Sequence, residues 1–126
     1  EEHAETLKSF NAPIMPLGPL PTDAAIGLDH ISNAIGSAFA ANLGIAHVIN
    51  CVTRYEHSQE QITTAATLEA IEAAKLAAHI ADISRHISEA VHSDEFITEQ
   101  RSLQRNCFAN GESCSRCSSV CPLKIV

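Results

Sequence analysis

Residues 29–52 read DHISNAIGSAFAANLGIAHVINCV, and this stretch decides the fold class. Residues 29–43 predict a helix, because apolar side chains recur there at intervals of three and four positions and therefore share one face. These side chains belong to Ile31, Ala34, Ile35, Ala38 and Phe39. Gly44 stands where a C-terminal helix cap is expected, and residues 46–52 then predict a buried strand because they are apolar and rich in β-branched side chains.

The residues before this stretch predict a second strand. Residues 14–17 form a short apolar run, which the proline-rich residues 18–21 end, and residues 3–10 predict a short helix ahead of it. Two strands separated by one helix are expected to lie parallel, with the helix as the crossover. Because both strands are short and apolar they need cover on both faces, which is typical of a section of a larger sheet or barrel.

The residues after this stretch are mostly helical. Ser58 and Gln61 form a capping-box pattern for a long helix over residues 59–92. Its apolar stripe comprises Leu76, Ile80, Ile83, Ile87 and Val91, and its polar stripe comprises Glu72, Lys75, His79, Asp82, His86 and Glu89. A further helix is predicted over residues 94–105, so the expected fold is α/β and helix-rich.

The composition excludes several classes of protein. The chain has 126 residues, a net charge of −7 and no run of lysine or arginine, so we expect no nucleic-acid binding. No apolar run approaches the roughly 20 residues of a membrane span and no signal peptide is visible, so we expect a cytoplasmic protein that does not enter a membrane. Five cysteines, four of them in the last twenty residues, favour a metal site in a reducing compartment over a secreted disulfide framework. Because the chain begins with Glu1, we expect it to have been processed or cut from a longer polypeptide.

The cysteines near the C-terminus are the strongest candidate site. Cys114, Cys117 and Cys121 have the spacing C-x2-C-x3-C, and thiolates at that density hold iron–sulfur clusters or zinc. Three ligands leave one position of an iron–sulfur centre open for a small molecule. Cys107 is a possible fourth ligand that would close it. From the residues alone a zinc knuckle completed by Cys107 or a histidine, and thiols without a metal, remain open.

Three further residues are candidates, and the first two have two interpretations each. His57 follows the second predicted strand and is either a metal ligand, weak when alone, or a loop histidine hydrogen-bonded to a carboxylate. Asp29 begins a predicted helix, where a carboxylate is favourable, and its alternative role is to hold the loop of an active site. Cys51 lies in the second predicted strand, which is apolar, and we expect it to be a buried small side chain.

Three stretches of the chain are specific enough to compare with a known family. They are residues 12–36, which contain GPLPTD and DHI, residues 52–57, which contain VT and EH, and residues 75–82, which read KLAAHIAD. Their order and spacing, followed by a terminal cysteine cluster, resemble the phosphomethylpyrimidine synthase family, whose members make the pyrimidine of thiamine.

The resemblance implies a (β/α)8 barrel followed by a C-terminal helical segment that carries a [4Fe–4S] cluster. Residues 1–92 would then form the last two strand–helix units of the barrel, and residues 93–126 a helix with the cysteine tail. The implied activity is that of a radical S-adenosylmethionine carbon–carbon lyase. The cluster reduces S-adenosylmethionine, and the resulting deoxyadenosyl radical converts 5-aminoimidazole ribotide to the pyrimidine phosphate.

The resemblance also implies site residues and partners. Cys114, Cys117 and Cys121 would bind the cluster, and His57 would bind zinc together with a histidine from an earlier strand that this chain lacks. The implied partners are the small-molecule substrate and either further copies of the chain, as a homo-oligomer, or the remainder of the barrel.

The chain departs from the family pattern at several places. The family tail is C-x2-C-x4-C, and the family has a substrate-contacting tyrosine where this chain has Met15. Residues 58–61 replace the family's Leu-Gly-Leu-Pro, and the segment between Asp82 and Cys114 is short and lacks tryptophan. The chain is therefore expected to be a fragment or a divergent relative. The alternative is a zinc-stabilised, non-catalytic module for binding or oligomerisation.

Overall fold

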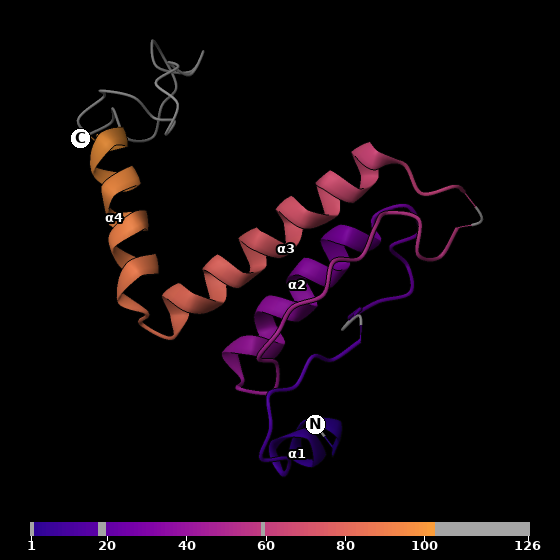
Figure 1. Ribbon diagram of the computed structural model, residues 1–126, viewed down its shortest axis with the longest axis horizontal. Helices are drawn as coiled ribbons and strands as arrows, with labels where there is room; N and C mark the ends of the chain where they lie inside the picture. The colour runs from indigo at the N-terminus through magenta and orange to yellow at the C-terminus, as the bar shows by residue number, and fades with distance from the viewer. Residues whose placement is uncertain (1, 18–19, 59, 103–126) are drawn as a thin grey trace. The chain divides into compact units, whose positions relative to one another are not determined.

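The computed structural model describes residues 2–17, 20–58 and 60–102, and Figure 1 shows the helices that they form. The helices are α1 (Glu2–Lys8), α2 (Asp29–Asn42), α3 (Thr64–Ser84) and α4 (Ser88–Ser102). Contacts divide the chain into two units, Glu1–Arg85 and His86–Val126. The first unit is built on the packing of α2 against α3, and α4 belongs to the second. The division after residue 92 that the resemblance implies stays a prediction.

Helix α2 begins and ends where the sequence predicts. After its last residue the chain turns through Gly44, whose φ of 72° is the left-handed conformation that glycine adopts without strain. The Gly44 N–H donates to the Ala41 carbonyl at 3.0 Å, and the Ile45 N–H donates to the Ala40 carbonyl at 3.0 Å. This is the double hydrogen bond of a Schellman motif, and it confirms the predicted cap.

Helix α3 is shorter than the predicted helix over residues 59–92. Its N-terminal cap is Thr63, whose side chain accepts a hydrogen bond from the Ala66 N–H at 3.2 Å, so the capping box predicted at Ser58 was wrong. The Ser58 hydroxyl accepts instead from the Glu60 N–H. At the other end His86 has a φ of 57°, which a right-handed helix does not accommodate, and the long predicted helix is therefore interrupted before α4.

The two predicted strands do not form. Within the described residues there is no strand, and residues 14–17 and 46–52 have irregular backbone. The two segments nevertheless touch, because the N–H groups of His47 and Val48 both donate to the Ile14 carbonyl, at 2.8 and 3.2 Å. Pro16 removes a donor from the middle of the first segment, so the contact does not extend into a ladder. The prediction that the chain is rich in helices is confirmed. The prediction of two strands was wrong for the described residues.

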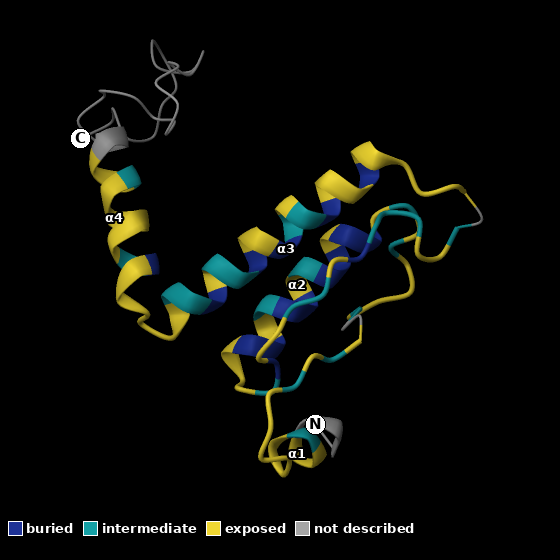
Figure 2. Ribbon diagram, viewed as in Figure 1, coloured by how far each residue is buried: buried dark blue, intermediate teal, exposed yellow. Residues whose placement is uncertain are grey.

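The core of the first unit consists of small side chains. The buried residues of α3 recur every three or four positions and are all alanine: Ala66, Ala70, Ala74, Ala77 and Ala81. In Figure 2 they form a dark blue line along the side of α3 that faces α2. Ala81 joins Ala40, Ala41 and Ala46 in one buried cluster. Side chains of this size let the two helices, which run in the same direction in Figure 1, approach closely.

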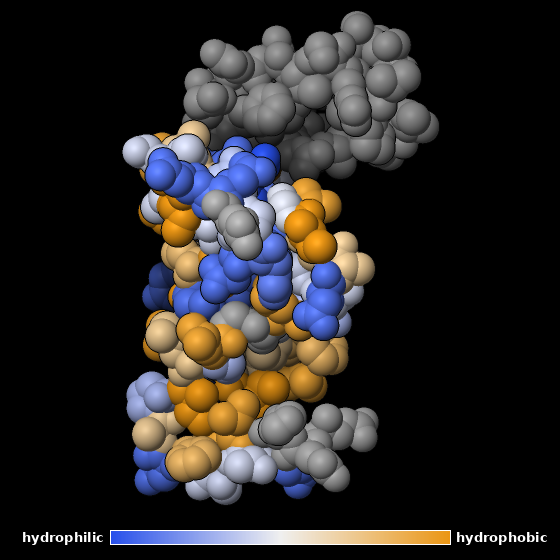
Figure 3. All heavy atoms as spheres, turned by 90° about the vertical axis from the view of Figure 1, so that its right-hand side faces the viewer, coloured by the Kyte–Doolittle hydropathy of each residue, from blue (hydrophilic) through white to orange (hydrophobic). Residues whose placement is uncertain are grey.

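The large apolar side chains of the two helices lie outside this core. Ile35 and Phe39 of α2 are 61% and 65% exposed, and Leu76 of α3 is 59% exposed. Together with neighbouring alanines and isoleucines they leave an apolar groove of about 390 Å³, lined by Ile31, Ala34, Ile35, Ala38, Ala73, Leu76, Ala77 and Ile80. Figure 3, which faces another side of the molecule, also shows apolar patches at the surface. None of the helices in the described part of the chain is long and apolar enough to cross a membrane.

Candidate functional site

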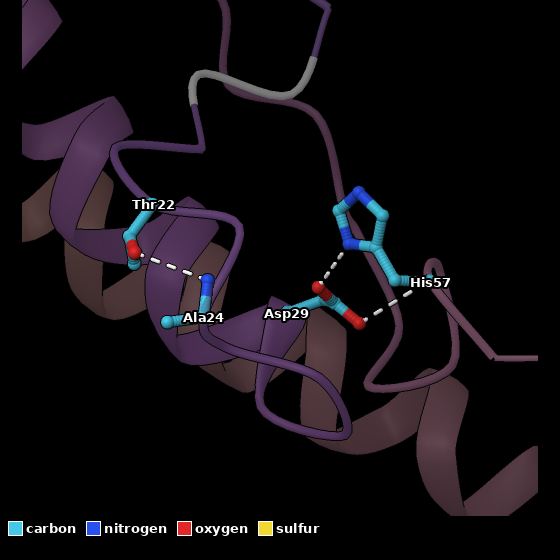
Figure 4. Close-up of polar contacts among 4 residues, drawn as sticks. All are labelled: Thr22, Ala24, Asp29 and His57. Atoms are coloured by element: carbon cyan, nitrogen blue, oxygen red, sulfur yellow. Dashed lines mark hydrogen bonds and ion pairs between the residues drawn. The ribbon is translucent and has the colours of Figure 1, made fainter.

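The site is built around a contact between the start of α2 and a loop that follows it by 28 positions. Asp29 is the first residue of α2 and its side chain is 1% exposed. One carboxylate oxygen, Oδ1, lies 2.6 Å from Nδ1 of His57, and the other, Oδ2, accepts a hydrogen bond from the His57 backbone N–H at 3.3 Å. Figure 4 shows both contacts, with the second ring nitrogen of His57 directed away from the carboxylate. Asp29 therefore holds both the backbone and the ring of His57.

The same contact sets the ionisation of both residues. Burial favours the neutral form of Asp29, but the hydrogen bonds from His57 outweigh this effect and hold the pKa of the carboxyl below its ordinary value. The hydrogen bond to Asp29 raises the pKa of His57, and the charges of Asp23 and Glu56 act in the same direction. The pair is therefore best described as a carboxylate and an imidazole that readily takes up a proton.

A polar face of α2 holds the chain segment that leads to His57. The Asn33 side-chain amide donates to the Asn50 carbonyl at 3.0 Å, and the Ser37 hydroxyl donates to Asn33 Oδ1 at 3.4 Å. Asn33 and Ser37 are each 1% exposed, as is Asp29. These three residues lie four positions apart, so they stack on one helix face. The segment before His57 forms no strand within the described residues, and the hydrogen bond from Asn33 of α2 attaches it to the helix instead.

The loop before His57 is also tied to α3. Nε of Arg54 lies 3.0 Å from a carboxylate oxygen of Glu69. The geometry is that of an ion pair rather than an aligned hydrogen bond, because Arg54 Nε has no hydrogen-bond partner. Both side chains are more than a third exposed, so the pair contributes little to stability. It links the loop before His57 to the second turn of α3.

The structure bears on only some of the predicted site residues. Cys107, Cys114, Cys117 and Cys121 lie outside the described residues, so cluster, zinc and metal-free thiols stay predictions. Cys51 was expected to be buried in a strand, and it is an exposed free thiol instead, because its segment forms no strand and joins no sheet within the described residues. Asp29 lies at the start of α2, as predicted, and its carboxylate contacts the loop at His57, whereas the membership of that loop in an active site stays a prediction. For His57 the hydrogen bond to a carboxylate is confirmed, and the binding of a metal stays a prediction.

His57 fits a metal site as a single ligand. A histidine that ligates a metal through one nitrogen commonly donates its other N–H to a carboxylate, and His57 has that arrangement with Asp29. No group of three or more His, Cys, Asp or Glu side chains that could hold a metal ion occurs among residues 2–17, 20–58 and 60–102. A zinc ion would therefore need further ligands from elsewhere.

Sequence reasoning missed Asn33 and Ser37. The pattern that could have identified them is the spacing of three small polar residues, Asp29, Asn33 and Ser37, at every fourth position of a predicted helix. A polar stripe of this kind is ordinarily interpreted as a solvated face, and here it is buried.

Comparison with known proteins places these residues in a family. Residues 3–107 match the model of the radical SAM ThiC family. This chain belongs to the radical SAM ThiC family. Its match to the family includes α2, α3, Asp29 and His57, and it ends before Cys114.

Curated relatives agree with this assignment. The chain is similar to a phosphomethylpyrimidine synthase of Syntrophus aciditrophicus, with 34% identity over 138 aligned positions that cover 90% of the chain and 31% of the relative. It is 38% identical to the phosphomethylpyrimidine synthase of Carboxydothermus hydrogenoformans, covering 92% of the chain and 31% of the relative. With the same-named protein of Methanococcus aeolicus it shares 45% identity over 75 positions. The ThiC-family chain thus spans about 31% of the length of the first two relatives.

Proposed function

We propose that this chain supplies the C-terminal part of a phosphomethylpyrimidine synthase and acts in thiamine biosynthesis. The observation that carries the proposal is the family match over residues 3–107, together with relatives of that name aligned over 90% or more of the chain. The reaction would be the radical rearrangement of 5-aminoimidazole ribotide, a carbon–carbon lyase reaction that depends on S-adenosylmethionine. Residues missing from this chain, in the other part of the family's polypeptide, would form most of the substrate pocket.

In this proposal Cys114, Cys117 and Cys121 hold a [4Fe–4S] cluster. These three thiolates would hold the cluster and would leave one of its irons without a protein ligand, where S-adenosylmethionine could bind. When bound, the cluster supplies a low-potential electron. Cys107 stays outside the ligand set, since a fourth thiolate would close the open iron. The short C-x2-C-x3-C spacing still brings three thiols to one centre.

The proposal also places the described residues in a (β/α)8 barrel. Residues 14–17 and 46–52 form no strand in the described part of this chain, and we place them where the last two strands of a complete barrel would run. The hydrogen bonds from His47 and Val48 to Ile14 support their being neighbours. The parallel direction of α2 and α3 suits consecutive strand–helix units. Active sites of such barrels lie at the carboxyl ends of the strands, so His57, just beyond residue 52, would face the substrate side. There it would bind zinc with a histidine from outside this chain.

A chimaera tests the proposed function. Residues 1–126 replace the aligned C-terminal part of the Carboxydothermus relative, and the product is expressed in a bacterium that lacks its own pyrimidine synthase. Growth without thiamine is the expected result, and the same chimaera with Cys117→Ala is expected to fail. A stable, soluble chimaera that does not restore growth would contradict the proposal.

A second candidate function is self-association, which the apolar groove between α2 and α3 favours. The groove is lined by alanine, isoleucine and leucine, which suits an apolar occupant. In line with the predicted homo-oligomer we propose a second copy of the chain, and the other outcome of the test is that the remainder of the family's polypeptide covers the groove. Two such helix pairs facing each other would bury both grooves in a four-helix core around a twofold axis, in keeping with the prediction of a homo-oligomer.

The groove predicts a dimer that one charge disrupts. Sedimentation velocity is expected to show a concentration-dependent dimer for the native chain and a monomer for Ile35→Glu, because a buried carboxylate without a partner is costly. Ile62→Glu is the matched control, since Ile62 is 66% exposed and lies outside the groove. A native chain that stays monomeric at all concentrations would show that the groove does not bind a second copy.

A further inference from the structure

We propose that Asp29 is a positioning residue that fixes both the tautomer and the orientation of His57, so that Nε2 is the ring atom presented for ligation. What Nε2 then binds rests on the proposed function. The choice of tautomer does not, because it follows from contacts within this chain.

The first step concerns the proton on the ring. Asp29 Oδ1 lies 2.6 Å from His57 Nδ1, and an ionised carboxylate can only accept a hydrogen bond. Nδ1 must therefore carry the proton. In the neutral ring the lone pair is then on Nε2, the nitrogen that Figure 4 shows directed away from Asp29.

The second step concerns what holds Asp29 itself. Its side chain is 1% exposed and sits at the first residue of α2, so it has little freedom to move. The His57 side chain is 39% exposed. The buried Asp29 side chain is thus fixed, and it orients the more exposed His57 ring. The Nε2 side of that ring is accessible to solvent.

The third step separates positioning from simple loop closure. The backbone hydrogen bond from His57 to Oδ2, the hydrogen bond from Asn33 to Asn50 and the Arg54–Glu69 ion pair already hold the loop. The ring contact to Oδ1 adds nothing to the path of the backbone. Its distinct consequence is the direction and protonation of the imidazole.

Nuclear magnetic resonance of the ring nitrogens tests this directly. The full chain is labelled with ¹⁵N, freed of metal with a chelator, and recorded at a pH where His57 is neutral. The native protein is expected to show His57 as the Nδ1–H tautomer. Asp29→Ala is expected to shift the ring toward the Nε2–H tautomer, which free histidine prefers. Asp29→Asn keeps the size of the side chain and is also expected to lower the Nδ1–H fraction. This variant provides the test if the alanine variant does not fold.

The matched control is Asp23→Asn, since Asp23 acts on His57 by charge without a hydrogen bond to its ring. It is expected to leave the tautomer unchanged. A native Nε2–H tautomer, or an equal shift in the Asp23 and Asp29 variants, would overturn the proposal. In the chimaera, Asp29→Ala is also expected to weaken zinc binding by about 10- to 100-fold. The tautomer does not depend on the cluster or on activity, so this proposal and the proposed function can fail separately.

Discussion

Anaerobic reconstitution with iron and sulfide is expected to turn the chain brown, with about four irons and four sulfides bound per molecule. The physical reason is the cysteine spacing: Cys114, Cys117 and Cys121 are close enough in sequence to reach one centre and too few to close it. Iron and sulfide analysis, with the visible absorbance of the protein, measures the result. Addition of S-adenosylmethionine is expected to perturb the spectrum, because one iron is left for an external ligand.

The cysteines offer their own controls for this experiment. Cys117→Ala is expected to abolish cluster binding, whereas Cys51→Ala is expected to leave it intact, because Cys51 is an exposed thiol of the first unit, well separated in sequence from the other four cysteines. Cys107→Ala distinguishes a site with three cysteine ligands from one with four. We expect this substitution to leave cluster binding unchanged. A colourless protein that binds one zinc, and that loses it on mutation of Cys107, would favour the alternative of a zinc-stabilised module.

Removal of the Asp29 carboxylate is expected to lower the stability of the first unit and to flatten its pH dependence. Asp29→Ala should reduce the free energy of unfolding, because the carboxylate accepts hydrogen bonds from both the ring and the backbone of His57, and the partial exposure of that ring keeps the reduction modest. Urea denaturation at several pH values, with a chelator present, measures both effects.

The direction of the pH dependence follows from the two pKa shifts. The pKa of His57 is raised, so its contribution is complete below its ordinary value of 6.5 and is lost as the pH rises through the raised value. The pKa of Asp29 is lowered, so its contribution is present above 3.8 and is lost as the pH falls through the lowered value. The native chain is therefore expected to have the full stability from the pair between pH 3.8 and pH 6.5, and to lose it as the pH rises through the raised pKa of His57.

Two comparisons check this prediction. Asp29→Asn should remove most of the difference in stability between pH 6 and pH 9, and Asp23→Asn should remove little of it, since Asp23 acts on His57 only by charge. An Asp29 variant whose profile matches that of the native chain would show that the pair does not contribute to folding in this range.

Helix positions could be predicted where they depend only on apolar periodicity and capping residues within a few positions. The period of the apolar residues located α2, and Gly44 marked its end because only the cap conformation requires a positive φ there. The end of α3 could not be predicted, because the period of apolar residues continues through His86 although the backbone does not. Strands were predicted from apolar runs, yet a strand exists only when another strand supplies its hydrogen bonds, and Pro16 removes one of the donors.

By itself the amino-acid sequence determined the family, through GPLPTD, DHI and KLAAHIAD, the helical character of the chain and the candidate ligands in its tail. These are local properties, readable from neighbours within a few positions. Three features follow from long-range packing instead: the polar face of α2 is buried, its apolar face lines a groove, and Asp29 contacts His57. The reason is that burial and pairing depend on which distant segment packs against a helix, and no periodicity within the helix specifies that segment.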